Sequence, residues 1–448
     1  MHKVHVYRNK TSKYEVIDME CISMIKDALS VVQPGDKVVI KPNFVRQCSL
    51  ESKEWEAVIT NPVLIRETIT ACLENLSKEG NESGEIIILD APQEDSDFKA
   101  IVKNIGLAQI VDEIQKTTSI PIHFYDIRIE RKITCNGIIV RRIKQVGDPK
   151  GYKTVEMGQE SCYANKENKD YYGADYDRSE AKKYHNEKSN SYVISGSVLD
   201  CDVFINMPKW KTHKIGGMTC CLKNAIGIIG VKNCIPHHTL GSPETKGDAY
   251  PEMNQKAKTE TNLKKFAHKI LSMKLPVVGY LVAGAKYALS PLQGKPMQTI
   301  RSGHWYGNDT LWRSILDLNR IIFYADKNGI MQNTQQRKYV AIIDGIIAGE
   351  KNGPMMPIAK KCGIVAVAFS PVVGDMAMSR LMGFDYKKIP SIYQGFSLRR
   401  YRIDGGIDEV EAEIESNVKS WNDRIVQIPL NETFCFEPAY GWERHIEL

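Results

Sequence analysis

The chain has 448 residues, which is too long for one small core and predicts one large or two moderate α/β domains. Hydrophobic residues make up 42% of it and charged residues 25%, values that exclude a disordered chain and are typical of a soluble globular protein. The formal net charge of +6 is mild for this length and argues against a nucleic-acid partner.

The 11 cysteines include no pair with the C-x-x-C spacing of zinc fingers and ferredoxins. We therefore expect no iron–sulfur cluster. The N-terminal residues contain no apolar signal-peptide core, so we expect reduced thiols and a cytoplasmic location.

The N-terminal part alternates between predicted strands and helices. Apolar spacing indicates strands over residues 2–8, 37–40, 85–89 and 122–127, and helices over 18–32, 62–76 and 98–114. Asn61 and Pro62 are suited to the N-cap and first turn of the middle helix. This order predicts an α/β fold with a doubly wound, mostly parallel sheet, in one large unit or two closely packed units.

Polar residues follow two of these strands. Lys41 and Asn43 come at the end of the second strand, and Asp90 follows the third. In a parallel sheet these positions share one rim, which is where such folds bind ligands.

Residues 147–190 are polar and have little periodicity. We interpret them as part of an insertion or lid over residues 147–195, between an N-terminal α/β unit (1–146) and a C-terminal α/β unit (196–448). A lid should become ordered and resist proteolysis when ligand binds.

The most informative stretch is residues 203–238. It begins with an apolar strand (203–207) and continues without a carboxylate through a run rich in lysine, glycine and histidine. The cations and titratable groups are Lys209, Lys211, Lys214, Lys223, Lys232, His213, His237 and His238. This composition is typical of an anion site, although no Walker sequence is present. A basic surface loop with a buried helix behind it is an equally good interpretation.

The C-terminal part returns to α/β patterning. A helical pattern over 263–289 is interrupted at Pro276, and Asn308 to Thr310 are suited to cap a helix that begins at Leu311. Strands are predicted over 339–343 and 363–369, with a Gly-Pro loop between them.

The longest apolar run covers residues 275–285. It is too short to span a bilayer, which requires about 20 residues. A buried helix is the first interpretation, and weak contact with a membrane surface is the second.

Several short segments along the chain have a distinctive sequence. They are KPN at Lys41–Asn43, TNP at Thr60–Pro62, LDAPQEDSDF at Leu89–Phe98, INMPKWKTH at Ile205–His213, LKNAIG at Leu222–Gly227, GNDTLWR at Gly307–Arg313, DLNR at Asp317–Arg320, DGIIAGEKNGP at Asp344–Pro354 and GDMAMSRLMGFD at Gly374–Asp385. With these segments the chain resembles the bacterial and archaeal family catalogued as domain of unknown function 362. The form with GNDTLWR resembles a subgroup found beside genes for surface polysaccharides. Many relatives carry a ferredoxin-like module, for which this chain lacks the clustered cysteines.

Our first hypothesis is an enzyme that acts on an anionic small molecule, such as a phosphorylated sugar or a nucleotide sugar. The predicted catalytic residues are His213, Lys211 and Asp317, with His213 as general acid or base. The predicted substrate-binding residues are Lys41, Asn43, Lys209, Lys223, Asn224, Asn308 and Arg313. The predicted ligands of Mg²⁺ or another divalent cation are Asp344, Glu350 and Asp375.

Each assignment has a structural alternative. Lys223 and Asp375 could form an ion pair, His213 could cap a helix, and Arg313 could pair with Asp317 along one helix.

Two other functions remain open. A soft-metal or redox protein would use His213, Cys220, Cys221, Cys234, His237 and His238, although buried thiols explain the adjacent cysteines better. A non-catalytic accessory protein would bind the same anion without turnover.

Overall fold

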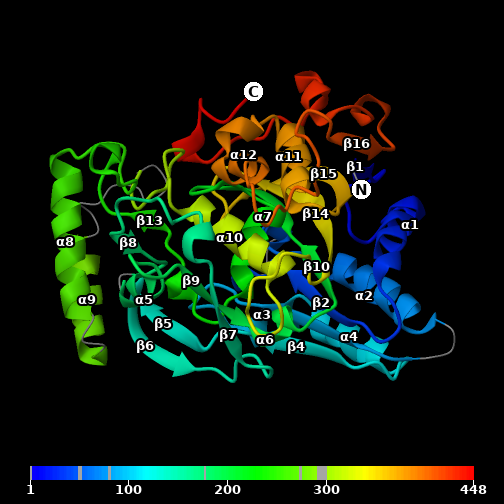
Figure 1. Ribbon diagram of the computed structural model, residues 1–448, viewed down its shortest axis with the longest axis horizontal. Helices are drawn as coiled ribbons and strands as arrows, with labels where there is room; N and C mark the ends of the chain where they lie inside the picture. Colours follow the sequence, from blue (N-terminus) through cyan, green and yellow to red (C-terminus); the bar gives the residue numbers. More distant parts are fainter. Residues whose placement is uncertain (1–2, 49–52, 79–81, 176–177, 272–274, 290–299) are drawn as a thin grey trace.

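One sheet joins the two ends of the chain. The computed structural model describes residues 3–48, 53–78, 82–175, 178–271, 275–289 and 300–448 (Figure 1). Within these residues, ten strands form this sheet. Eight follow each other in the order β16 (Glu413–Ser416), β1 (Lys3–Arg8), β15 (Ile358–Ala368), β14 (Lys338–Glu350), β10 (Val203–Met207), β2 (Lys37–Pro42), β3 (Glu85–Asp90) and β4 (Ile122–Asp126). The other two, β11 (Lys209–His213) and β12 (Gly217–Thr219), extend it beside β14.

The central strands are parallel. β14, β10, β2, β3 and β4 all run in one direction, whereas β15 is antiparallel to both of its neighbours. The predicted α/β class with a mostly parallel sheet is confirmed. Because β2 pairs directly with β10, the parts predicted as separate units, 1–146 and 196–448, contribute to one continuous sheet.

Helices cover both faces of the sheet, and alternate residues of each strand point to opposite faces. Val38 and Ile40 of β2 belong to the core on one face, and Val39 belongs to the core on the other. The first core is covered by α1 (Met19–Ala28), α2 (Pro62–Leu76), α3 (Phe98–Asn104) and α4 (Leu107–Gln115). The second is covered by α7 (Cys221–Asn224), α10 (Leu311–Tyr324), α11 (Pro371–Met382) and α12 (Pro390–Phe396).

Local signals in the first half are largely confirmed. The Asn61 side chain accepts a hydrogen bond from the Val63 N–H at 3.0 Å and caps α2, with Pro62 in the first turn. The predicted helix over 98–114 is two helices, because Gly106 adopts φ +75° between α3 and α4. The hairpin of β5 (Glu130–Cys135) and β6 (Ile138–Lys144) was not predicted.

Residues 147–195 are more ordered than the sequence suggested. They contain β7 (Tyr152–Glu156), β8 (Tyr171–Tyr172), α5 (Ser179–Tyr184) and β9 (Ser191–Ser195), with β7 and β9 paired. Tyr163 and Tyr192 are buried, and the Tyr163 hydroxyl donates to the Thr310 carbonyl at 2.7 Å. The segment therefore has a core made of buried tyrosines, which its polar composition does not reveal. These tyrosines attach the segment to the start of α10.

The C-terminal part corrects one prediction that bears on the site. β14 continues to Glu350, so the first part of the predicted Gly-Pro loop belongs to a long strand paired with β15, and residues 351–357 form the loop between the two strands. The Asp344-Gly345 pair has the composition of a turn, but the strand continues through a bulge between Gly345 and Ile347, so the prediction ends it too early. The break at Pro276 is confirmed, between α8 (Gln255–Leu271) and α9 (Pro276–Leu289). No helix in the described ranges combines the length and the apolar composition needed to cross a membrane.

Candidate anion-binding site

Polar side chains gather where the central parallel strands end. β2 ends at Pro42, β3 at Asp90 and β10 at Met207, so the residues around these ends share one rim of the sheet. The short helix α7 and the 3₁₀ turn after it lie over this rim, since Asn224 of α7 bonds to Lys41, Asn43 and Asn206. This is the place where open α/β sheets bind ligands.

Lys41 lies at the centre of a buried network. Its ammonium forms an ion pair with Asp90 at 2.9 Å and donates to Asn224 Oδ1 at 3.1 Å and to the Pro42 carbonyl at 2.7 Å. Asn43 Nδ2 donates to the same Asn224 oxygen at 3.0 Å, while Asn43 Oδ1 is buried and has no hydrogen-bond partner in the described part of the chain. Three predicted residues, Lys41, Asn43 and Asn224, are therefore in direct contact.

Gly227 closes one side of this network. A Cβ at this position would lie against Asp90 Oδ1 and 2.6 Å from Lys41 Nζ. We therefore expect Gly227→Ala to push the ion pair apart and to lower the free energy of unfolding by about 1–3 kcal/mol. Denaturant unfolding measures this change. Gly284→Ala is the matched control, because a Cβ there meets nothing within 4 Å; equal effects in the two variants would contradict the packing described.

Lys209 has a dedicated counter-ion. Its ammonium is fully buried, 2.9 Å from Asp344 Oδ2 and 2.6 Å from the Tyr14 hydroxyl. Asp344 also accepts hydrogen bonds from the Tyr14 hydroxyl at 2.6 Å and from the Asn61 N–H at 2.9 Å. Burial lowers the pKa of Lys209, and Asp344 opposes this shift. This pair is electrically balanced and has the character of a structural ion pair.

Lys211 is two residues further along the same strand and lacks such a partner. It is fully buried, and its ammonium donates to the Val58 carbonyl at 2.5 Å. Burial lowers the pKa of Lys211 far below its usual value, and the positive charges of Lys209 and Lys223 contribute to the same shift. A buried lysine without a counter-ion gains strongly from an incoming anion.

Lys223 and Lys232 extend the group of cations. Burial and the charges of Lys232 and Lys41 lower the pKa of Lys223 to about 7. Burial lowers the pKa of Lys232 to about 8, although Asp90 opposes the shift, and its ammonium donates to the Ala91 carbonyl at 2.8 Å. Within the described residues, Lys223 makes neither a hydrogen bond nor an ion pair through its ammonium. We call Lys41, Lys211, Lys223 and Lys232 the lysine cluster.

His213 lies beside the lysine cluster. Its Nδ1 accepts hydrogen bonds from the Ile215 and Gly216 N–H groups, both at 3.0 Å. Burial lowers the pKa of His213 far below its usual value, and the charges of Lys223, Lys214 and Lys211 contribute. The ring is therefore neutral, and the two bonds to Nδ1 place its proton on Nε2. In this form His213 can donate a hydrogen bond from Nε2, and its Nδ1 is occupied.

Two other predicted residues, Asp317 and Arg313, belong to a separate network on α10. Asp317 is fully buried and accepts from Ser161 Oγ at 2.5 Å, the Cys162 N–H at 3.0 Å and Arg320 at 3.2 Å. Arg313 pairs with Asp309 at 2.9 Å. These contacts hold the 147–195 segment against α10, so the structure does not place Asp317 and Arg313 with the lysine cluster.

Asn308 has a mixed position. Its Oδ1 accepts from the Leu311 N–H at 2.9 Å, so it helps to cap α10 as predicted. Its Nδ2 donates to the His237 carbonyl at 2.9 Å. Burial lowers the pKa of His237 to about 4, with contributions from Lys223 and Lys232. Asn308 therefore contacts a residue that borders the lysine cluster.

The predicted metal ligands are not brought together. Asp344 and Glu350 are six residues apart on β14, which corresponds to about 20 Å along an extended strand. Glu350 instead pairs with Lys360 at 2.7 Å. Asp375, on α11, accepts from the Cys221 N–H at 2.6 Å and the Leu222 N–H at 3.1 Å. One cation cannot contact all three carboxylates, so these residues do not form the shared metal site that the sequence suggested.

The predicted Cys/His site is also divided. Among the described residues, the one group whose donor atoms are close enough for a metal ion is Cys220, Cys221 and Asp375, and it contains no histidine. All three are buried, and burial raises the pKa of Asp375 to about 7 and that of Cys221 to about 11. Asp375 already accepts hydrogen bonds from the Cys221 and Leu222 N–H groups. The arrangement therefore favours a structural role, in which Asp375 holds the first turn of α7.

Two members of the site were missing from the predicted set. The sequence places Asp90 at the correct strand end without indicating a role for it, and in the structure it is the counter-ion of Lys41. Lys232 is one of the cations of the central stretch, and the sequence hypothesis gives it no role. The pattern that could have found it is the carboxylate-free run itself, because this run contributes three of the four clustered lysines.

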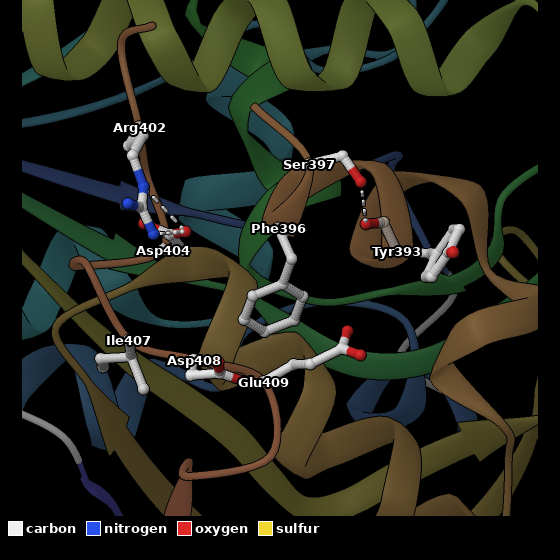
Figure 2. Close-up of a pocket in the computed structure, with 8 residues that line it drawn as sticks. All are labelled: Tyr393, Phe396, Ser397, Arg402, Asp404, Ile407, Asp408 and Glu409. Atoms are coloured by element: carbon white, nitrogen blue, oxygen red, sulfur yellow. Dashed lines mark hydrogen bonds and ion pairs between the residues drawn. The ribbon is translucent and has the colours of Figure 1, made fainter. Parts of the chain in front are cut away.

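A pocket elsewhere on the molecule has a different character. It measures about 350 Å³ and lies between α12 and residues 402–409 (Figure 2). In Figure 2 the Phe396 ring points into the space between these two segments, and Arg402 pairs with Asp404 at 2.8 Å. Asp408 and Glu409 also line it, and none of the predicted site residues does. The carboxylates that line this pocket would repel an anion, so we place the candidate anion-binding site at the lysine cluster.

Comparison with known proteins gives two results. The family described as "Domain of unknown function (DUF362)" matches residues 38–149 and 143–380. The crystal structure of a Thermotoga maritima protein, a structural genomics target, is similar at 12% sequence identity and a TM-score of 0.32, covering 76% of this chain and 53% of that protein. This chain thus corresponds to about half the length of that protein. None of the curated proteins matches it in sequence.

Proposed function

Because the chain belongs to the domain of unknown function 362 family, whose description names no activity, we propose a function from the site itself: an enzyme that binds an anionic, phosphorylated or carboxylated small molecule at the lysine cluster. The family resemblance inferred from the motifs is confirmed, and the polysaccharide-associated subgroup remains a prediction. A sugar phosphate or nucleotide sugar is the substrate class that this subgroup suggests.

One observation carries the proposal. The four lysines of the cluster are buried or half-buried beside one another, and within the described residues they form a single ion pair, Lys41 with Asp90. Burying an unpaired charge costs several kcal/mol in general. At the rim where open α/β sheets bind ligands, an incoming anion would compensate this cost.

The same residues support a catalytic role. Burial lowers the pKa of Lys211 well below its usual value, and a lysine with a lowered pKa can take up a proton or act as an amine nucleophile. A neutral His213 with its proton on Nε2 can donate a hydrogen bond to a developing negative charge. We propose Lys211 and His213 as the catalytic pair, with Lys41, Asn43, Lys223 and Asn224 holding the anion.

The test combines binding and turnover. Wild-type protein is heated with phosphate, pyrophosphate, sugar phosphates and nucleotide sugars, with and without Mg²⁺, and the anions that raise the unfolding temperature are assayed for conversion. Lys211→Ala and His213→Ala should remain folded and lose turnover at least tenfold, whereas Lys116→Ala, at an exposed lysine, should not. Ligand binding without conversion of any compound would favour the accessory-protein hypothesis, and unchanged turnover in both variants would refute the assignment.

Binding should also depend on pH in a defined direction. Lys223 and Lys232 have pKa values of about 7 and about 8, and an anion favours their protonated forms. Affinity should therefore fall as the pH rises from about 6.5 to about 9. Sulfate is the suitable probe, because its own charge does not change in this range. A sulfate dissociation constant that stays constant across the range would contradict the titration of these lysines on binding.

A further inference from the structure

The helices α8 and α9 stand at one end of the molecule, beyond the β5–β6 hairpin (Figure 1). α9 contacts the rest of the protein through β6, where Gly279 approaches so closely that a Cβ would lie 2.6 Å from the Ile139 carbonyl oxygen. Ala283 is the other buried residue of this side, and its carbonyl accepts from Asn136. The helix therefore packs onto the protein through its small residues.

The opposite side of α9 carries its large apolar residues. Val277, Tyr280, Leu281 and Tyr287 repeat at helical spacing and have exposed fractions of 70%, 59%, 70% and 69%. A helix on a water-facing surface normally buries such residues and exposes the small or polar ones. Across the described residues, seven of the twenty exposed large hydrophobic side chains fall between positions 255 and 289. This concentration makes α9 an apolar surface whose large side chains are left exposed by the described part of the chain.

The same segment carries the excess positive charge of the protein. Residues 255–289 contain seven lysines and one glutamate, a formal charge of +6 that equals the net charge of the entire chain. Lys256, Lys258 and Lys265 are exposed on α8, together with Leu263 and Phe266. Apolar side chains beside a dense group of lysines are the composition of helices that lie on anionic bilayers.

We propose that α8 and α9 form a docking surface for an anionic phospholipid bilayer, with α9 lying in the interface. The tyrosines of α9 suit this depth, because aromatic rings with a polar end are enriched at the membrane–water boundary. The 14 residues of α9 extend over about 21 Å, too short to cross a hydrocarbon core of about 30 Å. A second copy of the chain is a poorer occupant, since two segments of +6 would repel each other.

The experiment is co-sedimentation of the 448-residue chain with vesicles. Binding to vesicles of phosphatidylcholine with about one third phosphatidylglycerol should exceed binding to pure phosphatidylcholine at least tenfold and should weaken at high salt. The double variants Val277→Ser/Leu281→Ser and Lys258→Glu/Lys265→Glu should each reduce binding at least tenfold. Ile330→Ser is the matched control, since Ile330 is 60% exposed on a different surface.

The result that would overturn the proposal is also specific. Equal binding of wild-type protein and both double variants would exclude the surface as a lipid site. A dimer in light scattering that dissociates in the Val277→Ser/Leu281→Ser variant, without vesicle binding by the wild type, would assign the apolar face to a second copy instead. Unfolding temperatures close to that of the wild type establish that the substitutions act at the surface.

Discussion

Replacing Lys223 by methionine is expected to make the unliganded protein more stable and to remove most of its affinity for anions. Methionine has nearly the same length and no charge, and no described residue loses a hydrogen bond to the Lys223 ammonium. The folded state then no longer carries a cation whose pKa is lowered to about 7 by burial, Lys232 and Lys41. We expect a gain of about 1–3 kcal/mol in the free energy of unfolding.

The stability gained by Lys223→Met should depend on pH, and the direction of this dependence identifies the buried Lys223 charge as its cause. An unfolded lysine titrates near pH ~10.4, so Lys223 of the wild type releases its proton on folding between about pH 7 and about pH 10. Wild-type stability therefore rises with pH across this range, and the advantage of the variant is largest below about pH 7 and disappears above about pH 10. Denaturant unfolding at several pH values measures it. A variant less stable than the wild type at pH 7 would show that Lys223 already has a partner.

The loss of binding completes the first prediction. Phosphate should raise the unfolding temperature of the wild type, and the dissociation constant of the variant should be at least ten times higher. Lys116→Met is the control, because Lys116 is exposed and lies outside the lysine cluster. Greater stability together with weaker binding is the signature of a residue kept for function at the expense of stability.

The second large effect is expected at Asp344. Asp344→Asn removes the negative charge that faces Lys209 and disturbs the bonds from Tyr14 and Asn61. Because Lys209 and Asp344 are both fully buried, the unpaired ammonium should lower the free energy of unfolding by about 3–5 kcal/mol. Urea unfolding of the wild type and the variant measures the difference.

A second substitution separates a structural pair from a metal ligand. Lys209→Met alone should also destabilise, since it leaves the carboxylate unpaired, but combined with Asp344→Asn it should lose much less than the sum of the single effects. Strictly additive losses would contradict a direct pair. If Asp344 were a ligand of Mg²⁺, the ion would stabilise the wild type and not Asp344→Asn, which the pairing with Lys209 does not predict.

Much of the fold followed from local patterns. Asn61 and Pro62 predict the start of α2 correctly. The apolar runs of β2, β3 and β10 predict that Lys41, Asn43 and Asp90 lie at one rim of the sheet. What local patterns could not provide is the electrical environment of each lysine. Lys209 and Lys211 are alike in sequence context, yet β11 pairs with β14 so that Lys209 lies opposite Asp344, 135 positions later. Only this register distinguishes a balanced lysine from an unbalanced one.

The errors have related causes. The sequence predicts Glu350 in a loop because Asp344-Gly345 has the composition of a turn, whereas β14 continues through a bulge after Gly345. Asp317 was predicted to be catalytic from the polar residues around it, whereas its partners Ser161 and Cys162 come from a segment that looked like a loop. In each case a long-range contact, invisible in a local window, decides whether a carboxylate is free for chemistry.

The most direct measurement is the position of a bound anion. A crystal soaked in selenate reveals the anion by its anomalous scattering. If the lysine cluster is the anion site, selenate should lie within hydrogen-bond distance of the Lys223 and Lys211 ammonium groups. Crystals of Lys223→Met should contain no selenate there. Selenate confined to exposed lysines or arginines of the wild type, with the cluster unoccupied at a concentration that saturates the thermal shift, would contradict the anion site and with it the proposed function.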